Sequence, residues 1–260
     1  MSTRIPAVAG SFYPSEVRDL KNMINDFMET AKYPHIDGKL KGLIVPHAGY
    51  TYSGGIAALG YKLLKEKAPK TEHIYLIGPS HQARFYGVVQ SPDEFWRTPL
   101  GNVKMEQLDQ TDLIKNNAGI HMPEHCLEVQ IPFIQTILKD PRIYAFLTGD
   151  VAPLGFATQL KDNIEKDGIV IVSSDLSHYH TYNQANRLDS IANKAIPSLD
   201  IDQVEHSVEA CGKDAIITLM HLARMKKWKV KMLGYKNSGD TSGMKDQVVG
   251  YGVYAFYSSD

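Results

Sequence analysis

Three apolar runs in this chain each end in a loop that contains a histidine. The runs cover residues 43–45, 74–77 and 169–172. Short runs without polar alternation are typical of strands that are buried on both faces of a parallel sheet. The loops that follow these runs contain His47, His81 and His178. Because open α/β sheets bind their ligands at the carboxyl ends of such strands, we expect the three histidines to lie in one site.

Segments with helical periodicity alternate with these strands. We predict helices at residues 15–27, 53–64, 155–166, 183–195 and 211–225. We predict further strands at residues 143–147, 230–235 and 248–257, and a β excursion at residues 87–103. Residues 107–116 are predicted as a short helix, and residues 121–138 as a longer one that places His125 and Glu128 on one face. The alternation indicates an α/β fold with a central, mostly parallel or mixed sheet flanked by helices.

The size and charge of the chain restrict its class. With 260 residues, of which 43% are hydrophobic, the chain can bury one large core, so we expect a single α/β domain over residues 1–260. The formal net charge is -1 and there is no basic cluster, so we expect no nucleic-acid partner and no membrane partner. The amino terminus lacks an apolar signal core and no run reaches the roughly 18 apolar residues of a membrane span. We therefore expect a cytoplasmic protein.

Several common catalytic motifs are absent from the sequence. There is no G-x-S-x-G nucleophile elbow, no P-loop and no G-x-G-x-x-G fingerprint, which argues against a serine hydrolase and a nucleotide-binding protein. The two cysteines, Cys126 and Cys211, do not form a C-x-x-C zinc pattern. We expect both of them to be buried small apolar side chains rather than metal ligands.

The histidine loops suggest a metal site. Two histidines and a carboxylate with open positions form the facial triad of non-haem Fe(II) oxygenases, and zinc accepts the same ligands when a water completes the set. His47, His81 and Asp240 are the predicted metal ligands, with Asp240 following the strand at residues 230–235. Each histidine alone could instead satisfy buried backbone groups, and the Gly-Asp-Thr-Ser-Gly segment around Asp240 is also ordinary turn composition.

Other polar residues of the same loops are candidates for proton transfer. His178 is the predicted general acid/base, since a histidine beside a metal suits this role. Asp175 lies three residues before it and either orients His178 or caps a helix. His125 is a third predicted catalytic residue, and its neighbours Glu124 and Glu128 would both favour its charged form.

Four linked segments of this sequence resemble the MEMO family. They are residues 45–54 (VPHAGYTYSG), 78–81 (GPSH), 124–132 (EHCLEVQIP) and 173–178 (SSDLSH). The resemblance runs nearly end to end, from residues 9–13 to Tyr251, and identifies the chain as a microbial member. It implies a fold similar to that of the class III extradiol dioxygenases and a metal-type pocket that matches His47, His81, His125 and His178.

The resemblance also carries implications for partners and metals. Animal members are linked to cell motility, phosphotyrosine peptide binding and copper or iron binding, whereas prokaryotic relatives are grouped with radical-SAM and AMMECR-type proteins. A radical-SAM or AMMECR-type partner is therefore implied by resemblance only. Animal members join a cysteine to the motif histidines, and counting back from Tyr251 places its equivalent at Thr241, which has no thiol. Copper-thiolate chemistry is not expected on that basis.

Two functions of different classes follow from the sequence. The first is a metal-dependent oxidoreductase of dioxygenase-like type, with a small-molecule substrate, Fe(II) as the favoured cofactor and Zn(II) or Cu as other candidates. The alternative is a non-enzymatic module that binds a peptide or small ligand and keeps a relic of the metal pocket, with no cofactor. A zinc hydrolase ranks below both.

Overall fold

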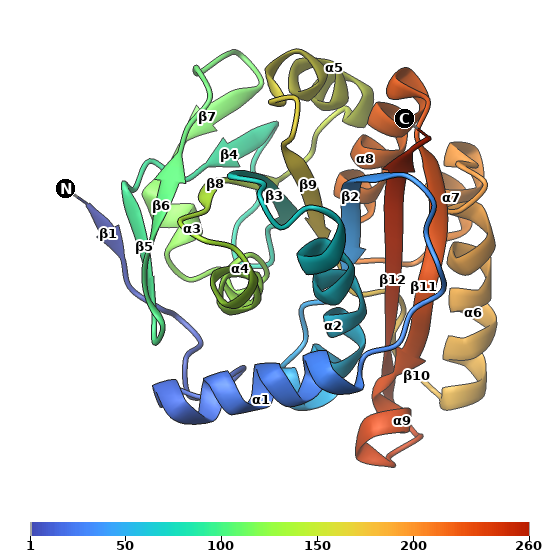
Figure 1. Cartoon of the computed structure of the whole chain (residues 1–260). Helices are drawn as coiled ribbons and strands as arrows, with labels where there is room; N and C mark the ends of the chain where they lie inside the picture. Colours follow the sequence, from blue (N-terminus) through green and yellow to red (C-terminus); the bar gives the residue numbers. More distant parts are fainter. Residues whose placement is uncertain (1, 260) are drawn as a thin grey trace.

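A mixed sheet of twelve strands forms the centre of the computed structural model, which describes residues 2–259 (Figure 1). The spatial order is β1-β5-β6-β8-β3-β9-β2-β12-β10, with β11 paired to β12, and β4 paired to β8 and β7. The strands are β1 (Thr3–Arg4), β2 (Lys39–Val45), β3 (His73–Pro79), β4 (Val88–Gln90), β5 (Phe95–Thr98), β6 (Gly101–Glu106), β7 (Ile114–Asn116), β8 (Arg142–Thr148), β9 (Ile169–Ser173), β10 (His178–His180), β11 (Lys229–Asn237) and β12 (Val248–Ser258). The predicted α/β class with a mixed sheet is confirmed.

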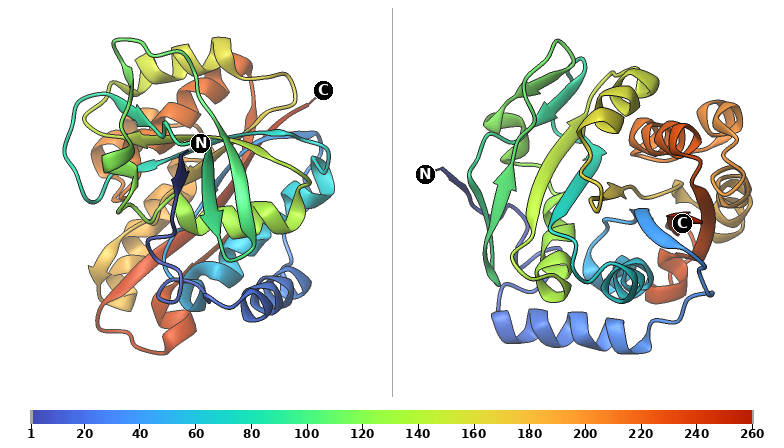
Figure 2. Two further views of the ribbon diagram at one scale, coloured as in Figure 1. Left: turned by 90° about the vertical axis from the view of Figure 1, so that its left-hand side faces the viewer. Right: turned by 45° about the horizontal axis from the view of Figure 1, so that its top comes forward.

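Helices cover both faces of this sheet (Figure 2). Their bounds are α1 (Val17–Thr30), α2 (Tyr50–Lys67), α3 (Ala118–His121), α4 (Ile131–Ile137), α5 (Pro153–Asn163), α6 (Tyr182–Ala195), α7 (Ile201–Ser207), α8 (Lys213–Lys226) and α9 (Ser238–Ser242), with a short 3-10 helix, η1, at Glu128–Gln130. None of the helices within residues 2–259 has both the length and the hydropathy that crossing a bilayer requires.

Alternate side chains of the central strands face two separate hydrophobic cores. Leu43 and Val45 of β2 belong to the core that α1, α2 and α4 cover, whereas Ile44 belongs to the core under α5, α6, α7 and α8. The runs in β3 and β9 alternate in the same way. Strands β8, β3, β9 and β2 are mutually parallel along this series. Because both faces are covered, these strands are apolar throughout, as the sequence predicts.

The loops after β2 and β9 leave the sheet toward opposite faces. Strand β2 leads into α2 on one face, while β9 leads through β10 into α6 on the other. The two strands are parallel neighbours, with Val45 opposite Ser173. Loops that diverge in this way open a crevice at the carboxyl ends of the strands. The loops that carry His47 and His178 both start at this crevice.

The short helix predicted at residues 107–116 is absent. This segment is extended and ends in β7, which pairs in parallel with β4. The Thr111 hydroxyl accepts the backbone N–H groups of Leu113 and Ile114 at 3.2 and 3.0 Å. Local side-chain bonds of this kind offer the backbone an alternative to a helix. The periodicity of a few residues was therefore a misleading signal here.

The predicted helix over residues 121–138 is broken before Glu128, so His125 and Glu128 do not share a helical face. His125 lies in the turn ahead of η1. Glu128 is directed instead toward the amino-terminal segment, where it accepts hydrogen bonds from Arg4 Nη1 at 2.6 Å and from the Tyr13 hydroxyl at 2.7 Å. Arg4 and Glu128 are buried, with 4% and 1% of their surfaces exposed. The turn that carries His125 is thus held by an interior ion pair.

Candidate metal centre

His47 is fixed at the end of β2 by two polar neighbours from the β9 loop. Its backbone N–H donates to Asp175 Oδ1 at 2.8 Å, and its ring Nδ1 lies 3.0 Å from Ser173 Oγ. The side chain is buried, and burial together with the neighbouring rings of His81 and His125 holds the pKa of His47 well below its usual value. A neutral imidazole whose Nδ1 is engaged presents Nε2 as its ligand atom.

Glu124 orients the other two imidazoles. Its carboxylate lies 2.9 Å from His81 Nδ1 and 3.1 Å from His125 Nδ1, and it also accepts the backbone N–H groups of both residues. The carboxylate is 2% exposed. Burial opposes its ionisation, but the hydrogen bonds from His125 and His81 outweigh burial and hold the pKa of Glu124 well below its usual range. The rings of His81 and His125 stack at a centroid distance of 4.8 Å as a result.

Cys211 completes this cluster and is the residue that the sequence interpretation missed. Its Sγ lies 3.3 Å from His47 Nε2, whereas both cysteines were expected to be mere apolar side chains. Gly212 lets the start of α8 approach the β9 loop, because a Cβ there would lie 2.8 Å from Ser174 Cβ. Thr241, the expected cysteine equivalent, instead bonds to Ser238 O within α9. A Cys-Gly pair directly before a helix was the available signal.

Two groups of potential ligands emerge within residues 2–259, and His81 belongs to both. One is His47, His81 and Cys211, and the other is His81, Glu124 and His125; the ligand atoms of each group lie within 4.8 Å of one another. Glu124 is already saturated by N–H donors, so it suits the support of ligands better than direct coordination. Two imidazoles and a thiol form a donor set that zinc, copper and iron all accept.

Burial sets the protonation state of the thiol and of the nearest carboxyl. Burial and the adjacent Asp175 raise the pKa of Cys211 to about 12. Burial also raises the pKa of Asp175 to about 6, although the backbone N–H of His47 opposes the rise. A thiol must lose its proton to coordinate a metal, so metal binding at Cys211 has to release a proton at neutral pH.

The structure places Asp175 and His178 at the cavity but does not pair them. Asp175 holds the His47 backbone and caps no helix, because the segment after β9 is a loop that leads into β10. The backbone N–H of His178 donates to Glu209 Oε1 at 2.9 Å, and its ring lines the cavity. Burial lowers the pKa of His178, which keeps the imidazole neutral and able to accept a proton.

Asp240 is not brought to the histidines. It lies on α9, at the same edge of the sheet, but its carboxylate accepts the backbone N–H of Asn237 at 2.9 Å and the hydroxyl of Tyr182 at 2.7 Å. Asp240 therefore closes a capping box at the start of α9. Ser238 and Ser242 are the α9 side chains that line the cavity. The turn interpretation of this segment describes the structure better than the ligand interpretation.

A cavity of about 710 Å³ is lined by Cys211 and by four histidines: His47, His81, His125 and His178. Polar groups form its floor, and its rim includes apolar and aromatic side chains: Phe12, Tyr52, Tyr179, Met244 and Tyr251. Tyr179 and Met244 are 71% and 68% exposed. The volume lies within the range of small-molecule sites, which combine an apolar lining with a few convergent polar groups.

Comparisons with known proteins agree with the resemblance seen in the sequence. A family model described as "Memo-like protein" matches residues 4–255. A "MEMO1 family protein" of Ignicoccus hospitalis is 34% identical over 98% of this chain and 99% of its own length. Relatives from Sulfurisphaera tokodaii and Methanopyrus kandleri are 34% and 32% identical over 95% and 97% of this chain, and over 97% and 98% of their own lengths. The alignment with a solved structure of an uncharacterized Escherichia coli K12 protein covers 82% of this chain and 99% of that protein, at 10% identity. The TM-score is 0.48, so no conclusion is based on this similarity. The chain belongs to the MEMO family.

Proposed function

We propose that this protein is a metal-dependent oxidoreductase with one Fe(II) held by His47, His81 and Cys211. The observation that carries the proposal is the convergence of two imidazoles and a thiol whose ligand atoms lie within 4.8 Å of one another. Both imidazoles have Nδ1 occupied by a protein partner, which leaves Nε2 for the metal. Bound there, iron would supply one-electron redox chemistry and a Lewis-acidic position for a substrate.

The residues around the donor set support proton transfer. His178 lines the cavity with a lowered pKa, so it can take a proton from a substrate. Asp175 has a pKa of about 6 and holds the His47 backbone, so its charge state affects the position of a ligand. The stacked His125 borders the same cavity and keeps its Nε2 free of Glu124. These groups support the proton-transfer part of the proposed function.

Anaerobic loading with Fe(II) tests the proposal. We expect about one iron per chain and, after oxidation, a thiolate-to-metal absorption band that Cys211→Ser removes. The matched control is Cys126→Ser, because Cys126 is the other cysteine and its thiol donates to Pro79 O at 3.1 Å rather than contacting an imidazole of the ligand set. Zinc retention without iron uptake would favour a hydrolase instead. Uptake of iron without a band, or equal bands in Cys211→Ser and wild type, contradicts the assignment of Cys211.

A ligand-binding module is the second candidate, and the rim of the cavity favours it. Tyr179 and Met244 expose most of their surfaces at the mouth of the cavity, which suits contact with a peptide or a small apolar ligand. This function requires neither a bound metal nor catalysis. Substitution of Cys211 by Ser should then leave ligand affinity unchanged, whereas an oxidoreductase would lose its turnover with the same variant.

A further inference from the structure

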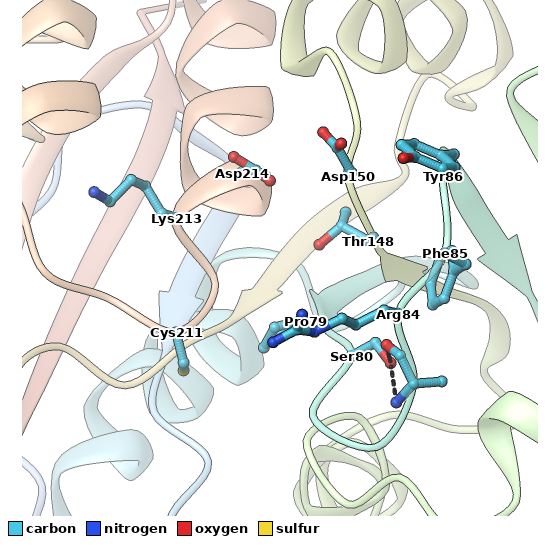
Figure 3. A pocket seen from close by; sticks show the side chains of 12 residues that line it. Pro79, Ser80, Arg84, Phe85, Tyr86, Thr148, Asp150, Cys211, Lys213 and Asp214 are labelled. Atoms are coloured by element: carbon cyan, nitrogen blue, oxygen red, sulfur yellow. Dashed lines mark hydrogen bonds between the residues drawn. The ribbon is translucent and has the colours of Figure 1, made fainter.

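A second cavity lies on the other side of Cys211. Its volume is about 480 Å³, and it is lined by the loops after β3 and β8 and by the start of α8 (Figure 3). Cys211 borders this cavity as well as the one above the histidines. The two cavities therefore share one wall at the carboxyl edge of the sheet. No role in the metal centre accounts for the charged residues of the second cavity.

Arg84 is the cation that faces this cavity. Its side chain extends across the cavity toward Cys211 (Figure 3), and it forms no ion pair or hydrogen bond with any of residues 2–259. The preceding turn is well defined, because the Ser80 hydroxyl donates to Ala83 O at 2.8 Å and accepts the Ala83 N–H at 3.3 Å. An arginine on a fixed turn without a partner presents a planar donor fork to a ligand.

Two carboxylates face the same cavity from the other side. Asp150 follows β8 and Asp214 lies in the first turn of α8, and Figure 3 shows both head groups directed into the space between these elements. Burial and then the negative charge of Asp150 raise the pKa of Asp214, because a nearby like charge disfavours the ionised carboxylate. Lys213 also borders the cavity and opposes the rise in the pKa of Asp214, but its amine donates to Glu205 O at 3.2 Å and is directed away from the cavity (Figure 3).

We propose that this cavity binds a small zwitterion that carries an ammonium and a carboxylate, of the size of a free amino acid. Arg84 takes the carboxylate, and Asp150 and Asp214 take the ammonium. The apolar part of the ligand packs on Phe85 and Tyr86, and Tyr86 is 87% exposed. A ligand with only a negative charge would be repelled by the carboxylates of Asp150 and Asp214. A ligand with only a positive charge would be repelled by Arg84 and would leave that arginine without a partner.

Charge complementarity and size both favour this ligand class. The protein offers one cation and two anions around a cavity of about 480 Å³. A ligand with an ammonium and a carboxylate at one end can contact both kinds of group, while its side chain extends toward the rim. A ligand seated there would border the Cys211 thiol. The proposal does not depend on a metal, and it can be tested with metal-free protein.

Titration calorimetry with L-leucine and two analogues tests the inference on the full chain without metal. The analogue 4-methylpentanoate lacks the ammonium, and 3-methylbutylamine lacks the carboxylate. We expect leucine to bind at least about tenfold more tightly than either analogue, because each analogue loses the charge-assisted hydrogen bonds of one end group. Equal affinity for leucine and 4-methylpentanoate, or no heat from leucine at millimolar concentration, overturns the proposal.

Variants on each side of the cavity locate the binding. Arg84→Gln and Asp214→Asn should each weaken leucine binding by about tenfold or more. Arg84 is exposed and unpaired, so its replacement should leave the fold intact. Arg97→Gln is the matched control, since Arg97 is an exposed arginine on β5 that contacts Asn102 at 3.3 Å. Unchanged leucine affinity in Arg84→Gln would place the ligand elsewhere and refute the assignment.

Discussion

Replacing Glu124 by glutamine should loosen the metal centre without removing any ligand of the proposed set. Glu124 fixes His81 through a ring bond of 2.9 Å and a backbone bond of 2.6 Å, and no solvent competes because the carboxylate is 2% exposed. Glutamine has the same shape but one acceptor oxygen and no charge. An imidazole ligand that loses its carboxylate partner loses basicity and a fixed orientation.

The expected loss of metal affinity follows from the number of metal-binding imidazoles that Glu124 orients through their Nδ1 atoms. Of the two imidazoles that Glu124 contacts, His81 belongs to the proposed ligand set with His47 and Cys211. Loss of one such supporting bond lowers metal affinity by about 10- to 100-fold. This corresponds to about 1.4–2.7 kcal/mol of binding free energy, at about 1.4 kcal/mol for each factor of ten.

Competition with a chromophoric chelator measures this change for Fe(II) or Zn(II). Glu128→Gln is the matched control, because Glu128 is a buried carboxylate four positions further along that is directed at Arg4 rather than at the cavity. The control should be less stable, but His81 keeps both of its bonds to Glu124, so metal affinity should fall less than in Glu124→Gln. If Glu124→Gln stays folded by circular dichroism and its metal affinity lies within about twofold of wild type, the orienting role of Glu124 is refuted.

Three further changes test the surrounding framework. Glu128→Ala should reduce the free energy of unfolding in urea by about 3–5 kcal/mol, because it leaves the buried Arg4 charge uncompensated; a loss below about 1 kcal/mol would contradict this. Burial lowers the pKa of His121 to about 4, so the unfolded chain takes up the proton first as the pH falls, and stability should decline between about pH 6.5 and 4. His121→Gln should flatten this decline by up to about one proton in pH-dependent denaturation, and an unchanged slope would exclude His121 as its source. Asp240→Ala should leave metal affinity unchanged while the loss of its bonds to the Asn237 N–H and the Tyr182 hydroxyl costs about 0.5–1.5 kcal/mol for each bond, and a tenfold loss of affinity would restore Asp240 as a ligand.

The sequence predicts the parallel strands and the position of the histidine loops. Leu43, Ile44 and Val45 are apolar without alternation because both faces of β2 are covered, and this pattern is readable without coordinates. The carboxyl ends of parallel strands share an edge, so His47 and His81 could be placed together in advance; their ring centroids lie 5.2 Å apart.

Short polar segments were less predictable. The segment at residues 107–116 contains too few residues for periodicity to separate a helix from a strand, and the Thr111 hydroxyl decided the outcome. Asp240 and its glycine neighbours fit both a ligand loop and a helix cap, and the choice depended on where Tyr182 and Asn237 offered donors.

The tertiary structure alone decided which residues complete the site. Cys211 lies 164 positions from His47 in sequence but 3.3 Å away in space, because Gly212 allows α8 to start against the β9 loop. Glu124 became the common partner of two imidazoles through the turn that breaks the expected helix. A pattern along one strand or helix reports which face is buried, because neighbouring side chains share that face. The distance between a thiol and an imidazole on separate elements depends on how those elements pack, and no local pattern encodes it.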